Sequence, residues 1–481
     1  MLLLIFVAGY SVTFVRFEAY ALEYAVVTEL AVVACSLLLT RLGGPLQVAL
    51  PFWVLLGLFL VAYYLKFYWI VTVPQMNLIS QFYLQSDYLS STNALMAAFI
   101  TTTYAFAAFC FAGWLVLGWL RRALHTEQAA GARPSQLACD YRLVSTLSLV
   151  AALVLVPLTA GIMGVYGIAV MGVEGERLPY HLAGLVYFTH GVLVPALLVL
   201  LFWSSWRAGL SRRTAFAVCL ILLNGLVDML LRSSRSGLLA ALTLLVFVLL
   251  VEGHRIRVKH VMWLTVGLVL AAFLFPVVSL YRNLRFVEIS GSVLSLFATA
   301  EHTAAGGGLL AIWNTLALGA SSVLLRLTGI DMLAIFHGTA VQPLGSLAWA
   351  VMASPGGIPR YVTVNIMGFS PDAVNAAAPG LVGWFYLLGG NIAGAVGTAL
   401  LAALAGIAWR VLGRLRLRSL PVAQVLFLSL LMSIALDGTI DTTFTWTILV
   451  WPLSAAGCEW LCRLRSGLNH VGQTAPQFAD P

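Results

Sequence analysis

The segment 94–119 reads ALMAAFITTTYAFAAFCFAGWLVLGW and contains no charged side chain. An uncharged apolar run of about 20 residues is long enough to cross the hydrocarbon core of a bilayer as one helix. The run is followed closely by Arg121 and Arg122, and basic residues at the end of a span are typical of its cytoplasmic side. The segment therefore predicts a membrane-spanning helix.

The composition extends this prediction to the whole chain. Of 481 residues, 61% are hydrophobic and 9% are charged, whereas soluble domains contain about 25% charged residues. So few polar groups cannot cover a water-facing surface. We therefore predict an all-α, polytopic integral membrane protein. The net charge of +8 does not indicate nucleic-acid binding, because the basic residues are spread thinly between apolar segments.

Apolar runs of spanning length recur along the chain. We expect about twelve spans, with a range of 11–14, and we expect the first to be retained because it has neither a basic start nor a small-residue cleavage site. The expected spans are 1–15, 22–40, 47–72, 94–119, 143–170, 181–203, 214–231, 237–252, 261–281, 381–408, 420–436 and 443–461. This divides the chain into nine spans in 1–281, a large outer loop in 282–380, and three spans with a tail in 381–481.

The connectors between the expected spans indicate the orientation. Every second connector is rich in arginine, as in 121–142, 207–213, 255–259 and 410–418. The positive-inside rule places these connectors and both chain ends in the cytoplasm. The other face then receives the loops 73–93 and 171–180, the turn 232–236 and the long loop.

The long loop contains two apolar stretches, 308–327 and 332–353, that could lie along the membrane interface, re-enter or span as an extra pair. Loops of this length are usually functional in compact proteins. The segment 300–308, AEHTAAGGG, predicts either a glycine hinge for a lid or a plain connector.

Arginines on the predicted outer face form the main candidate site. Two pairs have i, i+3 spacing, namely Arg232 with Arg235 and Arg282 with Arg285. On a helical turn this spacing places both guanidinium groups of a pair on one face, where their like charges repel unless an anion lies between them. Arginine forks match the oxygens of a diphosphate. The alternative is that they reach lipid headgroups or pair with acids such as Asp228, Glu288 and Asp331. The candidate diphosphate-binding residues are Arg232, Arg235, Arg282, Arg285, Arg326 and Arg360.

Acid–base and sugar-binding candidates lie on the same face. Glu301 and His302 are the candidate catalytic pair, since either could take a proton from a sugar hydroxyl. Asp437 and Asp441, which share a helical face, are candidates for sugar contacts or for helix capping, and the aromatic Tyr361 is a further sugar-binding candidate. Weaker acid–base candidates are His337, Asp331 and Asp372, and the polar residues within spans are His181, His190, Glu23 and Glu29.

The six cysteines follow no zinc or haem spacing, and none falls in an outer connector, so no metal site and no disulfide framework is predicted. The pair Cys458 and Cys462 lacks histidine or carboxylate partners for a metal.

Two stretches resemble a known family. The turn and span LRSSRSGLLAALTLLVFVLL (231–250) resembles the Ser-Arg-x-Gly turn of bacterial oligosaccharide repeat-unit polymerases. The run SPDAVNAAAPGLVGWFYLLGGNIAGAVGTALLAAL (370–404) resembles the end of their large periplasmic loop and the start of the next span. This is the Wzy-type O-antigen polymerase group, related in fold to the O-antigen ligases and, more loosely, to glycosyltransferases of the GT-C type.

The resemblance implies glycosyl transfer at the periplasmic face of a bacterial inner membrane, with undecaprenyl-diphosphate-linked oligosaccharide as donor and acceptor. It implies no cofactor and no metal, and it allows a chain-length regulator and a flippase as partners. Arg235 matches the motif arginine, whereas Arg232 departs from the pattern. An O-antigen ligase and a transporter of polysaccharide or lipid-linked sugar remain alternative functions.

Overall fold

The computed structural model describes residues 14–43, 46–72, 91–129, 139–168, 182–231, 236–253, 329–354, 357–369, 378–415, 417–437 and 442–464. Within these ranges every regular element is a helix and none is a strand. Six helices are long and apolar enough to cross a membrane: Phe17–Leu42, Val48–Val71, Thr92–Arg122, Tyr141–Tyr166, Leu182–Arg207 and Gly380–Arg414. The prediction of an all-α, membrane-embedded protein is confirmed at this level.

The helices follow the predicted spans closely. All of the twelve predicted spans except the first and the ninth, 1–15 and 261–281, coincide with described helices. The ninth lies outside the described residues, as does nearly all of the first. Two of the coinciding helices, Gly237–Val251 and Leu420–Leu436, are apolar but shorter than the six candidate spans.

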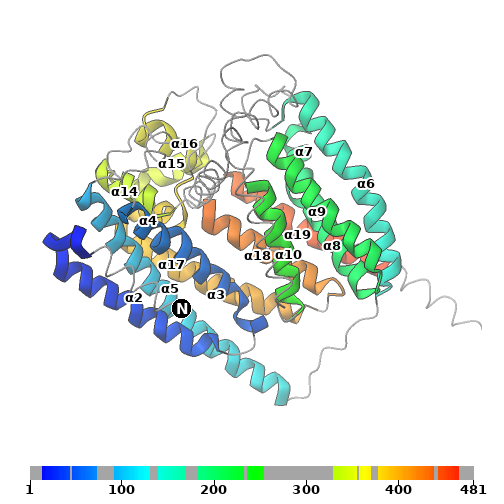
Figure 1. Cartoon of the computed structure of the whole chain (residues 1–481), viewed down its shortest axis with the longest axis horizontal. Coiled ribbons are helices and arrows are strands. Elements are labelled where there is room, and N and C mark those ends of the chain that lie inside the picture. The colour runs from blue at the N-terminus through cyan, green and yellow to red at the C-terminus, as the bar shows by residue number, and fades with distance from the viewer. Residues whose placement is uncertain are drawn as a thin grey trace, which may run out of the picture. The chain divides into compact units, whose positions relative to one another are not determined.

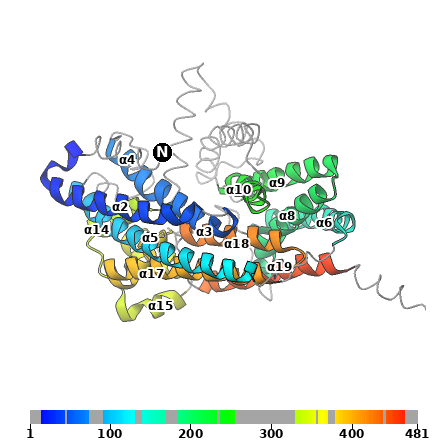
Figure 2. The ribbon, with the colours of Figure 1, turned by 90° about the horizontal axis from the view of Figure 1, so that it is seen from below.

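The chain divides into two compact units. Unit 1 contains Met1–Ala132, Val323–Val411 and Leu430–Trp446, and unit 2 contains the rest. The first elements of unit 1 are η1 (Phe14–Tyr20), α2 (Ala21–Leu42), α3 (Leu46–Phe59), the π-helix η2 (Leu60–Leu65), α4 (Lys66–Thr72) and α5 (Thr92–Ala129). Helices α2 and α5 pack side by side (Figures 1 and 2).

Aromatic rings fill the core between these helices. Phe67 stacks on Phe99 with 4.6 Å between ring centroids, and Tyr24 stacks on Phe99 at 5.1 Å. Each of these rings is almost completely buried. Stacked and edge-on aromatic pairs add to the energy of burying their surface, so this cluster fixes α2, α4 and α5 against one another.

The described part of the long loop forms short helices in unit 1. They are α14 (Ile330–Gly338), η6 (Gly345–Leu347), α15 (Ala348–Ala353), α16 (Gly357–Tyr361) and η7 (Val362–Ile366), grouped together in Figure 1. Helix α14 packs against α5, α4 and η2, and its residues 330–336 are all buried. Nine helical residues extend only about 14 Å, which is too short to cross a bilayer. The described residues 330–353 therefore do not span the membrane, which excludes the third predicted alternative, an extra spanning pair, for these residues. The stretch 308–327 lies outside the described residues.

Helix α17 (Leu381–Arg414) is broken at Gly389 and Gly390, whose backbone angles are not helical. A side chain at Gly397 would collide with the Phe385 ring, although twelve residues separate them in the sequence. In a straight helix that separation is about 18 Å. The segment 381–388 therefore folds back along 391–414. The segment 391–414 is roughly 36 Å long, which is enough to cross a bilayer by itself.

Basic residues predicted to share one face come together in unit 1. Arg121 donates a hydrogen bond to the backbone oxygen of Arg41, and the Arg41 guanidinium lies 5.3 Å from the Trp114 ring centre. The guanidinium of Arg410 lies 4.3 Å from the ring centre of Trp119. The C-terminal parts of α2 and α5 and the part of α17 around Arg410 thus lie at the same end of unit 1, as the predicted topology requires.

Unit 2 contains α6 (Tyr141–Tyr166), α7 (Leu182–Phe188), the π-helix η5 (Thr189–Leu193), α8 (Val194–Arg207), α9 (Ser211–Leu231) and α10 (Ser236–Val251). It also receives the first part of α18 (Leu420–Asp437) and most of α19 (Thr442–Arg463). Figure 2 shows α6, α8 and α9 close together. Helix α6 begins where the Asp140 side chain accepts a hydrogen bond from the Leu143 N–H. It ends at Gly167, whose left-handed backbone suits glycine.

The glycine of the Ser-Arg-x-Gly turn has a packing role. A Cβ atom at Gly237 would lie 2.6 Å from the backbone oxygen of Gly225, and one at Gly225 would lie 2.8 Å from the Gly237 oxygen. Small residues at both positions let α9 and α10 approach backbone to backbone, as is common between membrane helices. This part of the family resemblance therefore also has a structural explanation.

Candidate functional site

A groove on unit 1 combines polar and apolar walls. The groove encloses about 480 Å³ between η6, α15, α16 and η7. Its polar lining comes from Ser354, Arg360, Tyr361 and Asn365, and its apolar lining from Leu344, Leu347, Ala350, Val351 and Val364. Such a surface can hold an amphipathic ligand, with its polar group near the guanidinium and its apolar part along the aliphatic wall.

The break in α17 supports one wall of this groove. Because the helix is interrupted at Gly389 and Gly390, the backbone oxygen of Leu387 accepts a hydrogen bond from the Leu344 N–H at 2.7 Å. Irregular backbone at membrane depth is tolerated where protein groups satisfy it. The broken helix thus holds Leu344, a lining residue, in place.

The other side of the same break carries a polar cluster. The Thr101 hydroxyl of α5 donates to the Asn391 side-chain oxygen at 2.6 Å and lies 2.9 Å from Nε2 of His337. A hydroxyl has one hydrogen. The Thr101 hydroxyl also lies 3.0 Å from the Ala97 backbone oxygen, a second acceptor for the same hydrogen. When the hydrogen goes to either of these oxygens, His337 donates to Thr101 from Nε2 and its lone pair is on Nδ1. The cluster therefore favours the tautomer of His337 that has its hydrogen on Nε2.

His337 is half-buried at the end of α14, and its ring centre lies 4.8 Å from that of Tyr386. Burial lowers the pKa of the His337 imidazole to about 4, because the charged form loses hydration. The histidine is therefore neutral near pH 7, with Nδ1 able to accept a proton or a hydrogen bond.

A buried ion pair holds the other end of α14. Lys66 and Asp331 are both 0% exposed, and Nζ lies 2.8 Å from Oδ2. The other carboxylate oxygen of Asp331 accepts from the Gly329 N–H at 3.1 Å. A side chain at Gly329 would collide with the Ala62 backbone oxygen in the π-helix η2. Asp331, a weak acid–base candidate from the sequence, thus has an anchoring role instead.

Two of the predicted site residues line the groove. Arg360, a candidate diphosphate ligand, and Tyr361, a candidate sugar contact, are both half-buried in its wall. Asp437 is the last residue of α18, and its side chain is not described. The remaining predicted site residues lie outside the described residues: Arg232, Arg235, Arg282, Arg285, Arg326, Glu301, His302 and Asp441. The hinge at 306–308, Asp372 and His181 also lie outside them.

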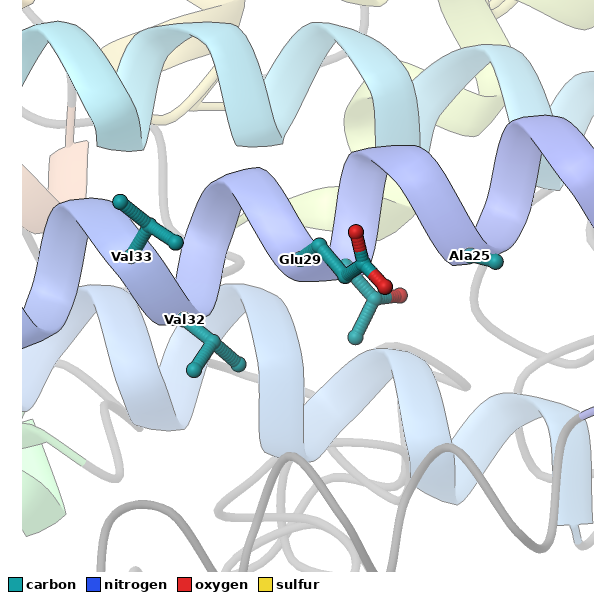
Figure 3. Close-up of a pocket in the computed structure, with 5 residues that line it drawn as sticks. Ala25, Glu29, Val32 and Val33 are labelled. Carbon is teal, nitrogen blue, oxygen red and sulfur yellow. The ribbon is translucent and has the colours of Figure 1, made fainter.

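The polar residues within other predicted spans lie elsewhere. In unit 2, His190 of η5 lies 2.9 Å from the Thr159 hydroxyl through Nδ1, and its Nε2 lies 3.8 Å from Asp228 of α9. In unit 1, Glu23 and Glu29 are exposed on α2. Glu29 borders a hollow of about 250 Å³ (Figure 3). All the residues that line this hollow, including Thr28, come from α2 alone, so it is a surface feature of one helix.

Sequence reasoning missed Lys66, Thr101 and Asn391. Lys66 gives a usable signal, because a lysine inside an apolar run marks a site or an ion pair by default. The run of three threonines at 101–103 is a weaker signal, since threonine hydroxyls commonly bond to their own helix. Asn391 directly follows the glycine pair that breaks α17.

The fold and these polar features define a helical, membrane-embedded protein with short helices packed into its first unit. Comparisons with protein-family models, with characterised proteins and with solved structures found no match.

Proposed function

We propose that the chain is a membrane glycosyltransferase that joins lipid-diphosphate-linked oligosaccharide repeat units into a polymer. In this proposal it has about twelve spans in a GT-C-like arrangement, lies in a bacterial inner membrane with both termini in the cytoplasm, and acts at the periplasmic face. The donor and acceptor are undecaprenyl-diphosphate-linked glycans. Two predictions from the sequence support it, namely the arginines expected on the outer face and the family resemblance of residues 231–250 and 370–404.

The observation that carries the proposal is the composition of the groove. Arg360 offers a permanent positive charge with a fork geometry that suits diphosphate oxygens. Tyr361 offers a ring for a sugar, while Leu347 and Val351 offer an apolar surface for a polyprenyl chain. Trp349, which is 78% exposed on α15 and is not a lining residue, suits the boundary between lipid and water. One groove thus presents groups for all three parts of a lipid-linked sugar.

The proposed chemistry is displacement at the anomeric carbon. Negative charge grows on the departing diphosphate, and a fixed guanidinium stabilises that charge more in the transition state than in the bound substrate. The attacking sugar hydroxyl must lose a proton. His337 does not line the groove, but among the described residues it is our candidate to accept this proton, because its imidazole is neutral and its contact with Thr101 favours a lone pair on Nδ1.

Deletion of the gene in its host tests this proposal, with lipid-linked and exported glycans analysed by gel electrophoresis and mass spectrometry. A polymerase predicts glycans that stop at one repeat unit and regain length when the intact gene is restored. Long polymer that remains unattached to its final acceptor would instead indicate a ligase. Repeat units trapped on the cytoplasmic side would indicate a transporter.

A further inference from the structure

Three candidate spans of unit 1 end in arginines that the fold brings to one end of the unit. Arg41 is one residue before the end of the candidate span Phe17–Leu42, and the span Thr92–Arg122 ends with Arg121 and Arg122. Arg410 lies about one helical turn before the end of Gly380–Arg414. These positions are far apart in the sequence, so only the packing of α2, α5 and α17 makes them neighbours.

Two tryptophans of α5 hold two of these arginines in place. The guanidinium carbon of Arg41 lies 5.3 Å from the ring centre of Trp114. The guanidinium carbon of Arg410 lies 4.3 Å from the ring centre of Trp119. Arg121 also donates a hydrogen bond to the backbone oxygen of Arg41. A cation over an aromatic face is attracted to the ring, which restricts the long side chain before a ligand binds. A ligand of these arginines therefore loses less affinity to the ordering of side chains.

The stretches that meet at this end of unit 1 are strongly basic. Residues 36–42 of α2, 110–122 of α5 and 405–411 of α17 contain four arginines and no lysine, aspartate or glutamate, which gives them a net charge of +4. Guanidinium groups stay charged at any physiological pH and bind phosphate oxygens in a bidentate fork. The stretches therefore offer both the charge and the donor geometry that a phosphate group requires.

Exposed apolar side chains lead along the same three helices towards the arginines. Leu37 is exposed one turn before Arg41 on α2, and Leu115 is exposed on α5. On α17, Ile407 is exposed three residues before Arg410. In a membrane such side chains contact acyl chains, while the ends of the spans lie at the level of the headgroups. The surface therefore suits a lipid, which uses both its apolar and its charged parts, better than a soluble phosphate.

We propose that Arg41, Arg121 and Arg410 bind the phosphodiester of an anionic phospholipid at this end of unit 1. The phosphate oxygens accept hydrogen bonds from the guanidinium groups, which Trp114 and Trp119 hold in position, and the acyl chains lie along the exposed apolar side chains. The predicted topology places this site in the cytoplasmic leaflet, where basic pockets between spanning helices bind anionic headgroups. None of these residues lines the groove, so the inference does not depend on the proposed function.

Native mass spectrometry of the full-length protein in detergent tests this site. After removal of bound lipid, the first phosphatidylglycerol molecule should bind with a lower Kd than phosphatidylethanolamine of the same chain length, and inorganic phosphate should not displace it. Replacing Arg41 or Arg410 by glutamine should raise the Kd for phosphatidylglycerol about fivefold, which corresponds to about 1 kcal/mol for each basic residue near an anionic lipid. Circular dichroism would confirm that both variants keep their helices.

Arg212→Gln is the matched control, because Arg212 is also an arginine of the predicted cytoplasmic face and is exposed at the start of α9 in unit 2. This change should leave the Kd for phosphatidylglycerol unaltered. If Arg212→Gln and Arg410→Gln weakened binding equally, any basic side chain would attract the lipid, and the proposed site would be wrong.

A second measurement uses the unchanged protein and needs no variant. Phosphatidylglycerol with a photoreactive group beside its phosphate should, on irradiation, become attached to peptides that contain residues 110–122 or 405–411. Attachment only to other peptides would overturn the proposal. Equal affinity for phosphatidylethanolamine, or displacement of the bound lipid by inorganic phosphate, would overturn it as well.

Discussion

Breaking the ion pair between Lys66 and Asp331 should destabilise unit 1 more than any surface charge change. The two side chains are fully buried, and their charged atoms lie 2.8 Å apart. At an effective dielectric constant of about 20, their attraction is about 6 kcal/mol, which offsets the several kcal/mol that each ion loses on leaving water. Removing one partner leaves the other charge buried without compensation. We therefore expect Lys66→Met or Asp331→Leu to cost about 3–5 kcal/mol each.

The double variant, Lys66→Met with Asp331→Leu, gives a sharper test. With both charges gone, the remaining losses are the Gly329 hydrogen bond and imperfect packing, so it should cost only about 1–2 kcal/mol, less than either single change. Unfolding in mixed detergent micelles, followed by circular dichroism, measures all three. Arg212→Met is the control, since Arg212 is exposed at the start of α9, and it should change the stability by about 0.5 kcal/mol or less. Additive losses from the two single changes would refute the reasoning.

Other features of the structure give further expectations. Replacing Gly237 by alanine puts a methyl group against the Gly225 backbone oxygen and should destabilise unit 2 by about 1–3 kcal/mol, measurable by the same unfolding assay. Thr101→Val removes the hydroxyl between His337 and Asn391. It should lower the polymerisation rate, while Thr101→Ser restores it; equal rates in both variants would contradict the role given to the hydroxyl. In a purified assay, the rate should be level from about pH 6 to 8 and fall at acid pH as His337 is protonated around its pKa of about 4. The His337→Ala variant should have a low polymerisation rate that does not fall further at acid pH.

The sequence was sufficient to locate most helices because spanning length and low charge are local properties of a segment. The run at 94–119 shows this, since Thr92–Arg122 is one of the six candidate spans. The predicted grouping of basic connectors also agrees with the contacts of Arg41 with Arg121 and of Arg410 with Trp119.

The site was harder to predict because it depends on contacts between distant segments. Two adjacent glycines in an apolar run are usually tolerated within a membrane helix, so nothing local shows that Gly389 and Gly390 reverse the chain. Similarly, Lys66 is recognisable as unusual, but its partner is 265 positions away in the chain, since 331 − 66 = 265. Arg360 and Tyr361 were predicted from residue type and from their place in the long loop, and only the fold shows that they line a groove.

The length of the glycan made by Arg360→Ala tests the central claim most directly. The variant would replace the gene in its host, with Arg212→Ala, an exposed arginine at the start of α9, as the matched control. Membrane insertion of both proteins would be checked by immunoblot. The proposed diphosphate contact predicts that Arg360→Ala reduces polymer to one or a few repeat units, while Arg212→Ala makes chains of normal length. Normal chain length in an Arg360→Ala strain with normal protein levels would contradict the claim that this groove binds the lipid-linked donor.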